Sequence, residues 1–154
     1  MTPYDRLKEL GLSLPPPPEP AAAFAMAVAS GDLLFLSGHI AMRGGEPWTG
    51  QLGKNVTLDD GRKAARTIAL DLLATLHGYL GDLSRVRRVV KVLCLVNSTA
   101  AFSDQHLVAN GCSELLLAVL AERGRHARSA IGVAQLPLGA CVEIELVAEV
   151  ARPE

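Results

Sequence analysis

Two charged residues near the C-terminus, Arg128 and Glu143, have the types and positions to do chemistry. Arg128 opens a predicted strand directly after the basic segment 123–127, and a guanidinium there can hold a carboxylate through two parallel hydrogen bonds. Glu143 lies mid-strand among apolar neighbours, where a carboxylate needs a partner or a raised pKa. Each residue has a structural alternative: an ion pair at the surface or at an interface for Arg128, and a solvated strand face for Glu143.

The remaining reactive side chains form no recognised motif. The sequence holds no Gly-rich phosphate loop, GxSxG elbow or HExxH motif. Cys94, Cys112 and Cys141 are widely spaced, lie in apolar contexts and do not cluster with histidines. We therefore expect reduced thiols that pack as small hydrophobes, and no metal site. His39 follows Ser37 closely and is a candidate to line a cleft.

The N-terminal 20 residues are expected to stand apart from the rest of the chain. Thr2 as N-cap, Pro3 at the first helical position and Gly11 past the end predict a helix over residues 3–10. The prolines of segment 15–20 then impose an extended arm, because each ring fixes φ and removes a donor. The chain is thus divided into a helix and Pro-rich arm (1–20) and one main domain (21–154).

The main domain alternates strand and helix patterns in the order ββ(β)αβαββ, with a short strand allowed in the Gly-rich loop 43–56. This order predicts an α+β fold: a mixed six-stranded sheet with two long helices on one face. The helix over 57–81 has an apolar stripe, and its opposite face, which includes Asp71 and Thr75, is expected to be wet. The predicted strands are 24–28, 33–36, 86–96, 129–134 and 141–150, and the second long helix begins within 103–107 and ends near 124.

The last two predicted strands are joined by a short turn within residues 135–139. If that turn makes a hairpin, Arg128 lies opposite Val147 and Glu143 lies opposite Gly132. The two charged side chains are then about four residues of strand apart, or on the order of 13 Å. A small ligand could span part of that gap.

One face of the sheet is left without a helix to cover it. On the last strand Ile144 and Leu146 point to one face, while Glu143, Glu145 and Glu149 point to the other. We assign the apolar set to the helices. A second face that combines carboxylates with apolar residues of other strands forms a patch of the kind that marks interfaces. The sequence therefore predicts a homo-oligomer with closed symmetry.

Composition narrows the classes of function. The 154 residues are 49% hydrophobic, which excludes a disordered chain, and no apolar run approaches the length of a membrane span. Lys and Arg number 15 against 16 Asp and Glu, and aromatics are 4%, so phosphate neutralisation and base stacking have little support and a nucleic-acid partner is not expected. The basic residues of segment 85–91 alternate with valines as on a solvated face. We expect a cytoplasmic protein.

The segment from Arg128 to Glu145, RSAIGVAQLPLGACVEIE, resembles the C-terminal signature of the RidA/YjgF family, also called endoribonuclease L-PSP. That signature is Arg-Ser/Thr, a short strand, Leu-Pro and Val-Glu-Ile-Glu. Ser37, Gly38 and Asn110 also fall where similar proteins have these residues. The resemblance covers about residues 18–150, and the N-terminal extension is similar to that of a divergent branch.

The resemblance implies a chorismate-mutase-like fold, a homotrimer with its helices outside, and ligand clefts between subunits. It implies hydrolytic deamination of reactive 2-imino or enamine acids to 2-keto acids and ammonia, without a cofactor. Arg128 would hold the substrate carboxylate, Glu143 would position or activate water, and the backbone near Ala130 would hold the imine. The other residues implied to bind substrate are Phe24, Ser37, Gly38 and Asn110.

This chain departs from the archetypal members at two of these positions. Phe24 stands where they carry a Tyr, so a hydroxyl is missing, and Ala130 stands where they carry a Cys. Two alternatives to the deaminase therefore stay open. One is a non-catalytic trimeric binder of small carboxylate metabolites, and the other is an endoribonuclease or translation inhibitor. Whether the protein is an enzyme is left open at this stage.

Overall fold

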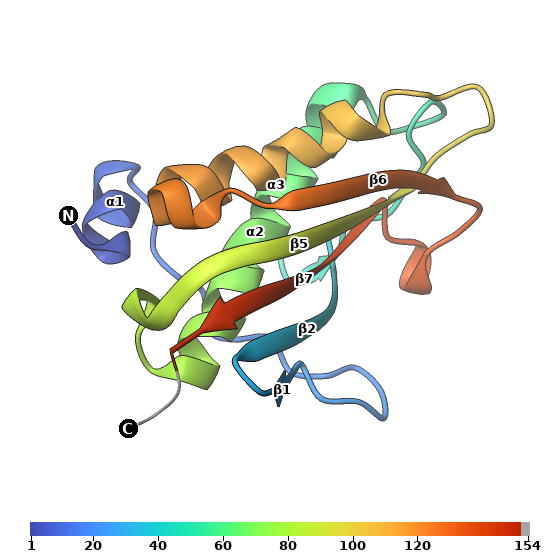
Figure 1. The fold of residues 1–154 in the computed structure, drawn as a ribbon. Helices are drawn as coiled ribbons and strands as arrows, with labels where there is room; N and C mark the ends of the chain where they lie inside the picture. The colour runs from blue at the N-terminus through green and yellow to red at the C-terminus, as the bar shows by residue number, and fades with distance from the viewer. Residues whose placement is uncertain (152–154) are drawn as a thin grey trace.

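A five-stranded mixed sheet carries two long helices on one face in the computed structural model, which describes residues 1–151 (Figure 1). The strand order is β1-β2-β7-β5-β6, and α2 and α3 cover the same face, as predicted for an α+β fold. The elements are α1 (Pro3–Glu9), β1 (Ala27–Ser30), β2 (Leu33–Ile40), β3 (Met42–Arg43), β4 (Glu46–Pro47), α2 (Leu58–Leu80), β5 (Val86–Asn97), α3 (Gln105–Leu120), β6 (Ala127–Val133) and β7 (Val142–Val150).

The main sheet has five strands rather than the expected six. The Gly-rich loop does form strands, but β3 and β4 pair only with each other, as a separate two-stranded sheet. Gly44 and Gly45, which join these two strands, have positive φ angles of 61° and 80°. The chain therefore turns back at once instead of extending along β2. The first strand also begins later than predicted, at Ala27. Phe24 precedes it in a bend in which its N–H donates to the carbonyl of Ala22.

The expected hairpin between the last two strands is wrong. β5 lies between β6 and β7 and pairs parallel with β6 and antiparallel with β7. Arg128 therefore lies opposite Val92, and Glu143 lies opposite Leu95 on β5 and Ile40 on β2. The turn at Pro137–Gly139 crosses over the end of β5 instead of closing a ladder. Arg128 and Glu143 are consequently two strands apart, about 10 Å across the sheet.

The helix ends follow from their capping residues. Thr2 and Asp5 form a capping box at the start of α1, and the Thr57 hydroxyl accepts a bond of 3.1 Å from the Asp60 N–H at the start of α2. α2 is capped at its C-terminal end by Gly81, whose φ of 78° is the left-handed conformation that glycine adopts without strain. All three predicted helices are confirmed. No helix within residues 1–151 is long and apolar enough to cross a membrane.

The alternation of side chains along β7 is also confirmed. Ile144 and Leu146 are buried beneath the helices, and Glu145, between them, is exposed on the open face. Exposed apolar side chains on the same side of the sheet or at its edges are Val28, Leu33, Phe35, Val90 and Ile131.

Gly111 sets the distance between the two long helices. A Cβ added at Gly111 would collide with the backbone carbonyl oxygen of Arg62 on α2. This close crossing explains why a helix of apolar residues contains a glycine at a buried position.

We expect Gly111→Ala to destabilise the fold by about 2 kcal/mol or more, because the methyl group must push two helix backbones apart. In an unhindered helix the same change stabilises by about 1 kcal/mol. The sign of the change in the free energy of unfolding therefore shows whether the two helices cross closely. Urea unfolding followed by circular dichroism measures it. Gly44→Ala is the control: nothing lies within 4 Å of its added Cβ, and only its positive φ is penalised. A stabilised Gly111→Ala protein would contradict the close crossing.

Candidate functional site

The side chain of Arg128 points from β6 toward α3 and is held there by three neutral acceptors. Nη1 donates to Asn110 Oδ1 at 2.9 Å and to Ser113 Oγ at 3.1 Å, and Nη2 donates to the His106 carbonyl oxygen at 3.0 Å. No carboxylate in the described part of the chain forms an ion pair with it. The guanidinium is thus fixed in place, and its positive charge is left uncompensated.

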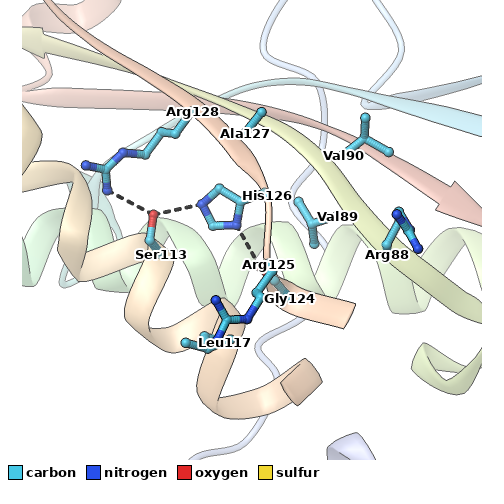
Figure 2. A pocket seen from close by; sticks show the side chains of 10 residues that line it. All are labelled: Arg88, Val89, Val90, Ser113, Leu117, Gly124, Arg125, His126, Ala127 and Arg128. Carbon is cyan, nitrogen blue, oxygen red and sulfur yellow. Dashed lines mark hydrogen bonds between the residues drawn. The ribbon is translucent and has the colours of Figure 1, made fainter. Parts of the chain in front are cut away.

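Arg128 lies at the side of an open cavity of about 640 Å³, which we name the arginine pocket. Figure 2 shows Ser113 between Arg128 and His126, with hydrogen bonds to both. Burial lowers the pKa of His126, and the nearby charge of Arg128 lowers it further, so the ring is neutral at pH 7. The lining residues are Arg88, Val89, Val90, Ser113, Leu117, Gly124, Arg125, His126, Ala127 and Arg128.

A second cavity, of about 910 Å³, lies at the other end of the sheet, and we name it the carboxylate pocket. It brings together four of the predicted site residues, Phe24, Ser37, Gly38 and Glu143. Gly38 is required there, because a Cβ at this position would collide with the Glu143 carboxylate. The lining residues are Pro18, Glu19, Ala21, Ala22, Phe24, Met26, Ser37, Gly38, His39, Ile40, Met42, Pro47, Asp71, Pro137, Leu138, Glu143 and Glu145.

The carboxylate pocket holds acidic groups whose protons are retained to unusually high pH. Burial raises the pKa of Glu143, and the neighbouring charge of Glu145 raises it further. Burial alone raises the pKa of Asp71 to about 6. No Lys or Arg lines this pocket within residues 1–151. The pocket is therefore suited to accept and return protons near neutral pH.

Asp71 was not found by sequence reasoning, which placed it on the wet face of α2. The structure corrects this assignment for two polar residues of that face: Asp71 lines the carboxylate pocket, and Thr75, one turn later, is 5% exposed. A carboxylate within an amphipathic helix is normally solvated, so the sequence alone carried no signal for it. Only the position of β2 and the Pro-rich arm over this part of α2 makes it a pocket residue.

His39 is a structural support for the pocket. It is 3% exposed, its Nδ1–H donates to the Ser37 carbonyl at 2.6 Å, and its Nε2 accepts from the Thr75 hydroxyl at 2.8 Å. Burial lowers the pKa of His39, in agreement with a neutral ring that both donates and accepts. The ring ties the irregular part of β2, between Leu36 and His39, to α2. It thereby holds Ser37 and Gly38 beside Glu143.

The predicted site residues are thus divided into two groups within one chain. Arg128 and Asn110 lie together between β6 and α3, and Phe24, Ser37, Gly38 and Glu143 lie together in the carboxylate pocket. The sheet separates the groups: Arg128 projects to the helix side of edge strand β6, and Glu143 projects to the open face of β7. Ala130 lines neither pocket and packs against the core.

The sequence model of the family described as Endoribonuclease L-PSP matches residues 16–150. The chain belongs to this family. Protein TCP17 of Trypanosoma cruzi is 46% identical over 145 residues, which cover 93% of this chain and 91% of that protein. The family model spans every strand of the described fold together with α2 and α3, and it leaves out α1.

Solved structures of similar proteins share the whole arrangement, including the N-terminal region. The protein Atu1372 of Agrobacterium tumefaciens, of unknown function, is 42% identical with a TM-score of 0.90, covering 97% of this chain and 94% of that one. A protein of Shewanella oneidensis MR-1 is 29% identical with a TM-score of 0.93, covering 97% of this chain and all of that one. RidA from the Antarctic bacterium Psychrobacter sp. PAMC 21119 is 23% identical with a TM-score of 0.59, covering 87% of this chain and 94% of that one, which confirms the RidA/YjgF-type fold class.

The cysteines of this family member do not belong to the site. Burial raises the pKa of Cys94 to about 12 and that of Cys141 to about 11. Cys112 is fully buried, and its pKa is raised as well. All three are free thiols that stay protonated near pH 7, so they pack as hydrophobes and are poor nucleophiles. Among residues 1–151 no group of three or more His, Cys, Asp and Glu is placed to hold a metal ion.

We expect Asp71→Asn to stabilise the protein at alkaline pH. The unfolded chain loses this proton near pH 3.8 and the folded chain near pH 6. The native state therefore binds more protons between these values, and the contribution of Asp71 to stability falls as pH rises from about 4 to about 6. With solvent screening of this half-buried group, the variant gains on the order of 1 kcal/mol at pH 8 and nothing at pH 4.

Thermal unfolding at both pH values measures this difference. Asp59→Asn is the control, because Asp59 is an exposed carboxylate in the first turn of α2 that pairs with Lys63. It is expected not to stabilise at either pH. Equal stabilities of Asp71→Asn and wild type at pH 8 would show that Asp71 is solvated, against its place in the carboxylate pocket.

Proposed function

We propose that this protein hydrolyses reactive 2-imino and enamine acids to 2-keto acids and ammonia, in a cleft shared by two copies of the chain. The observation that carries the proposal is Arg128: a half-buried guanidinium, held by three neutral acceptors, with no ion-pair partner among residues 1–151. A fixed cation of this kind is stabilised by an incoming carboxylate through two parallel hydrogen bonds. The substrate is therefore an acid.

The division of the site supports a shared cleft. In one chain no small ligand can contact both Arg128 and Glu143, because they project from opposite faces of the sheet and are two strands apart. The edge of β6 is open, and apolar side chains are exposed on the uncovered face. Head-to-tail association in a closed ring would cover these surfaces and bring the arginine pocket of one copy to the carboxylate pocket of the next. We propose a homotrimer, in keeping with the oligomeric character of the family.

The carboxylate pocket supplies the chemistry. A protonated 2-imino acid carries a carboxylate for Arg128 and a cationic nitrogen that the ionised Glu143 attracts. Glu143 takes one proton from a water molecule as the water oxygen bonds to the imine carbon. It then returns that proton to the nitrogen, and as the carbon–nitrogen bond breaks it takes the remaining hydroxyl proton, so that the 2-keto acid forms and ammonia leaves with this proton as ammonium. The imine carbon is already electrophilic, so we propose no cofactor.

The walls of the carboxylate pocket favour substrates with apolar side chains. Phe24, Met26 and Leu138 line it without offering a hydrogen bond from their side chains. The hydroxyl that archetypal members place at Phe24 is missing, so the reacting water is held by Glu143 and by backbone groups near Gly38. If these groups do not hold the reacting water, the protein would be a trimer that binds such acids without turnover.

A second candidate, cleavage of RNA, is favoured by the arginine pocket. Arg88, Arg125 and Arg128 surround a neutral His126 there. If Nε2 of this ring exchanges its hydrogen bond with Ser113 for a ribose hydroxyl, it can take the hydroxyl proton while the guanidinium stabilises the phosphate. The formal net charge of −1 argues against a wide RNA footprint. RNA cleavage that persists through exhaustive purification and disappears in His126→Leu would establish this candidate.

Arg128→Ala should lower kcat/KM for 2-keto acid release from enzymatically generated 2-aminoacrylate by about 100-fold, because two charge-assisted hydrogen bonds are lost. Arg128→Lys should recover only part of this loss, since an ammonium cannot bond in a bidentate way. Arg87→Ala is the control, because Arg87 is exposed and pairs weakly with Glu149. Unchanged activity in Arg128→Ala would refute the proposed clamp.

Glu143→Gln should lower kcat by about 100-fold or more and change KM little, because the amide still fills the space but cannot take a proton. Glu143 must be ionised to act and burial raises its pKa. Wild-type activity should therefore fall on acidification through a pKa above the ordinary 4.5, and this acid limb should be missing from the residual activity of Glu143→Gln. Glu149→Gln, on the same strand outside the pocket, is the control. A kcat that survives Glu143→Gln would exclude Glu143 as the base.

A further inference from the structure

We infer that Ser113 and His126 are positioning residues that aim Arg128 at the ligand carboxylate. This inference rests on the proposed role of Arg128 and adds two side chains that act through it without contacting the substrate. Neither position belongs to the sequence signature, and His126 reads from the sequence as a residue of a basic turn.

The hydrogen bonds of the pair can run in only one direction when His126 is neutral (Figure 2). The Gly124 carbonyl can only accept, so the bond of 2.6 Å places the ring proton on His126 Nδ1. His126 Nε2 is then an acceptor and takes the Ser113 hydroxyl proton over 2.8 Å. The lone pairs of Ser113 Oγ are thereby left for the Arg128 Nη1–H, at 3.1 Å.

His126 is needed because the hydroxyl of a serine within a helix can otherwise donate its proton to a backbone carbonyl of the same helix. Ser113 lies in the interior of α3, where a serine hydroxyl usually turns back to a carbonyl of the preceding turn. Donation to His126 instead turns the oxygen toward β6. The ring is itself fixed by a tight turn: a Cβ at Gly124 would collide with the Leu116 carbonyl, so residues 121–124 lie directly against α3.

The pair holds Arg128 without weakening its charge. An arginine has several rotatable bonds, and a loose guanidinium must lose that freedom when a ligand binds. A carboxylate brace would restrict it but would also neutralise it. Ser113, together with Asn110 and the His106 carbonyl, restricts it with neutral groups only. Since Arg128 contacts the carboxylate equally before and during the reaction, the brace is expected to affect KM and leave kcat alone.

The test compares removal of each group with its conservative replacement. Ser113→Ala removes the acceptor, whereas Ser113→Thr keeps a hydroxyl; His126→Leu removes the ring nitrogen, whereas His126→Gln offers an amide oxygen to the Ser113 proton. Kd is measured by calorimetry for 2-oxobutanoate and for its uncharged analogue 2-oxobutanamide, and KM and kcat in the 2-aminoacrylate assay. Ser13→Ala, on the N-terminal arm and outside both named pockets, is the matched control.

We expect Ser113→Ala and His126→Leu to raise KM and the Kd for 2-oxobutanoate by about tenfold, with kcat within about twofold of wild type. His126→Gln and Ser113→Thr should recover most of this loss. Binding of 2-oxobutanamide should be weak in every variant and unaffected by these changes. Melting temperatures and solution mass confirm that each variant is folded, and the His126→Leu and His126→Gln pair decides the matter if Ser113→Ala does not fold.

Wild-type affinity for 2-oxobutanoate in both Ser113→Ala and His126→Leu, with affinity lost in Arg128→Ala, would overturn this inference and leave the proposed function standing. A His126→Gln protein as weak as His126→Leu would also overturn it, because the hydrogen-bond acceptor would not be the relevant property. Affinity retained in Arg128→Ala would instead refute the proposed function itself.

Discussion

The site depends on a guanidinium that is held firmly and left charged. Arg128 projects from an edge strand, where a long side chain would normally move freely in solvent. Three hydrogen bonds to α3 prevent this, and all three acceptors are neutral. An ion pair would have fixed the side chain equally well and would have cancelled the charge that a ligand needs. The rest of the fold packs α3 beside β6, where these bonds form, and the close crossing at Gly111 holds α3 against α2.

Acidic groups, in contrast to the cationic Arg128, lie together at the other end of the sheet. The carboxylate pocket contains acidic groups and apolar walls and, within residues 1–151, no Lys or Arg. Asp71 is held there at a cost in stability, since its carboxyl is desolvated without a compensating partner among residues 1–151. A protein that binds a carboxylate and moves a proton needs a cationic group and an acidic group. Within one chain these two groups are kept apart, so neither neutralises the other. Their meeting in a cleft between copies is what the proposed assembly provides.

Much of the fold could be predicted from the sequence because its signals are local. The stripe and caps of α2, the capping box at Thr2 and the alternation of side chains on β7 are each set by neighbours along the chain. The strand that pairs with β6 cannot be predicted from neighbours along the chain. A Pro-Gly turn is compatible both with a hairpin and with a crossing to the far side of β5, and the parallel pairing with β5 decided between them.

The candidate site was predictable in part for the same reason. The signature from Arg128 to Glu145 and the Ser37-Gly38 pair identified residues that the structure does gather, but into two pockets. The roles of Asp71, Ser113 and His126 required tertiary structure, because a polar residue on an amphipathic helix or in a turn has the same sequence pattern whether it faces solvent or a cavity. Phe24 lines the carboxylate pocket although it precedes β1 and is not part of it.

The most direct test of a site shared between copies is complementation between two inactive variants. Arg128→Ala and Glu143→Gln chains are unfolded together, refolded as a mixture and assayed for 2-keto acid release. In a randomly mixed ring, about a quarter of the clefts receive an intact Arg128 from one chain and an intact Glu143 from the next. We therefore predict that about a quarter of wild-type activity returns. A mixture no more active than its two components would contradict a cleft built by two chains.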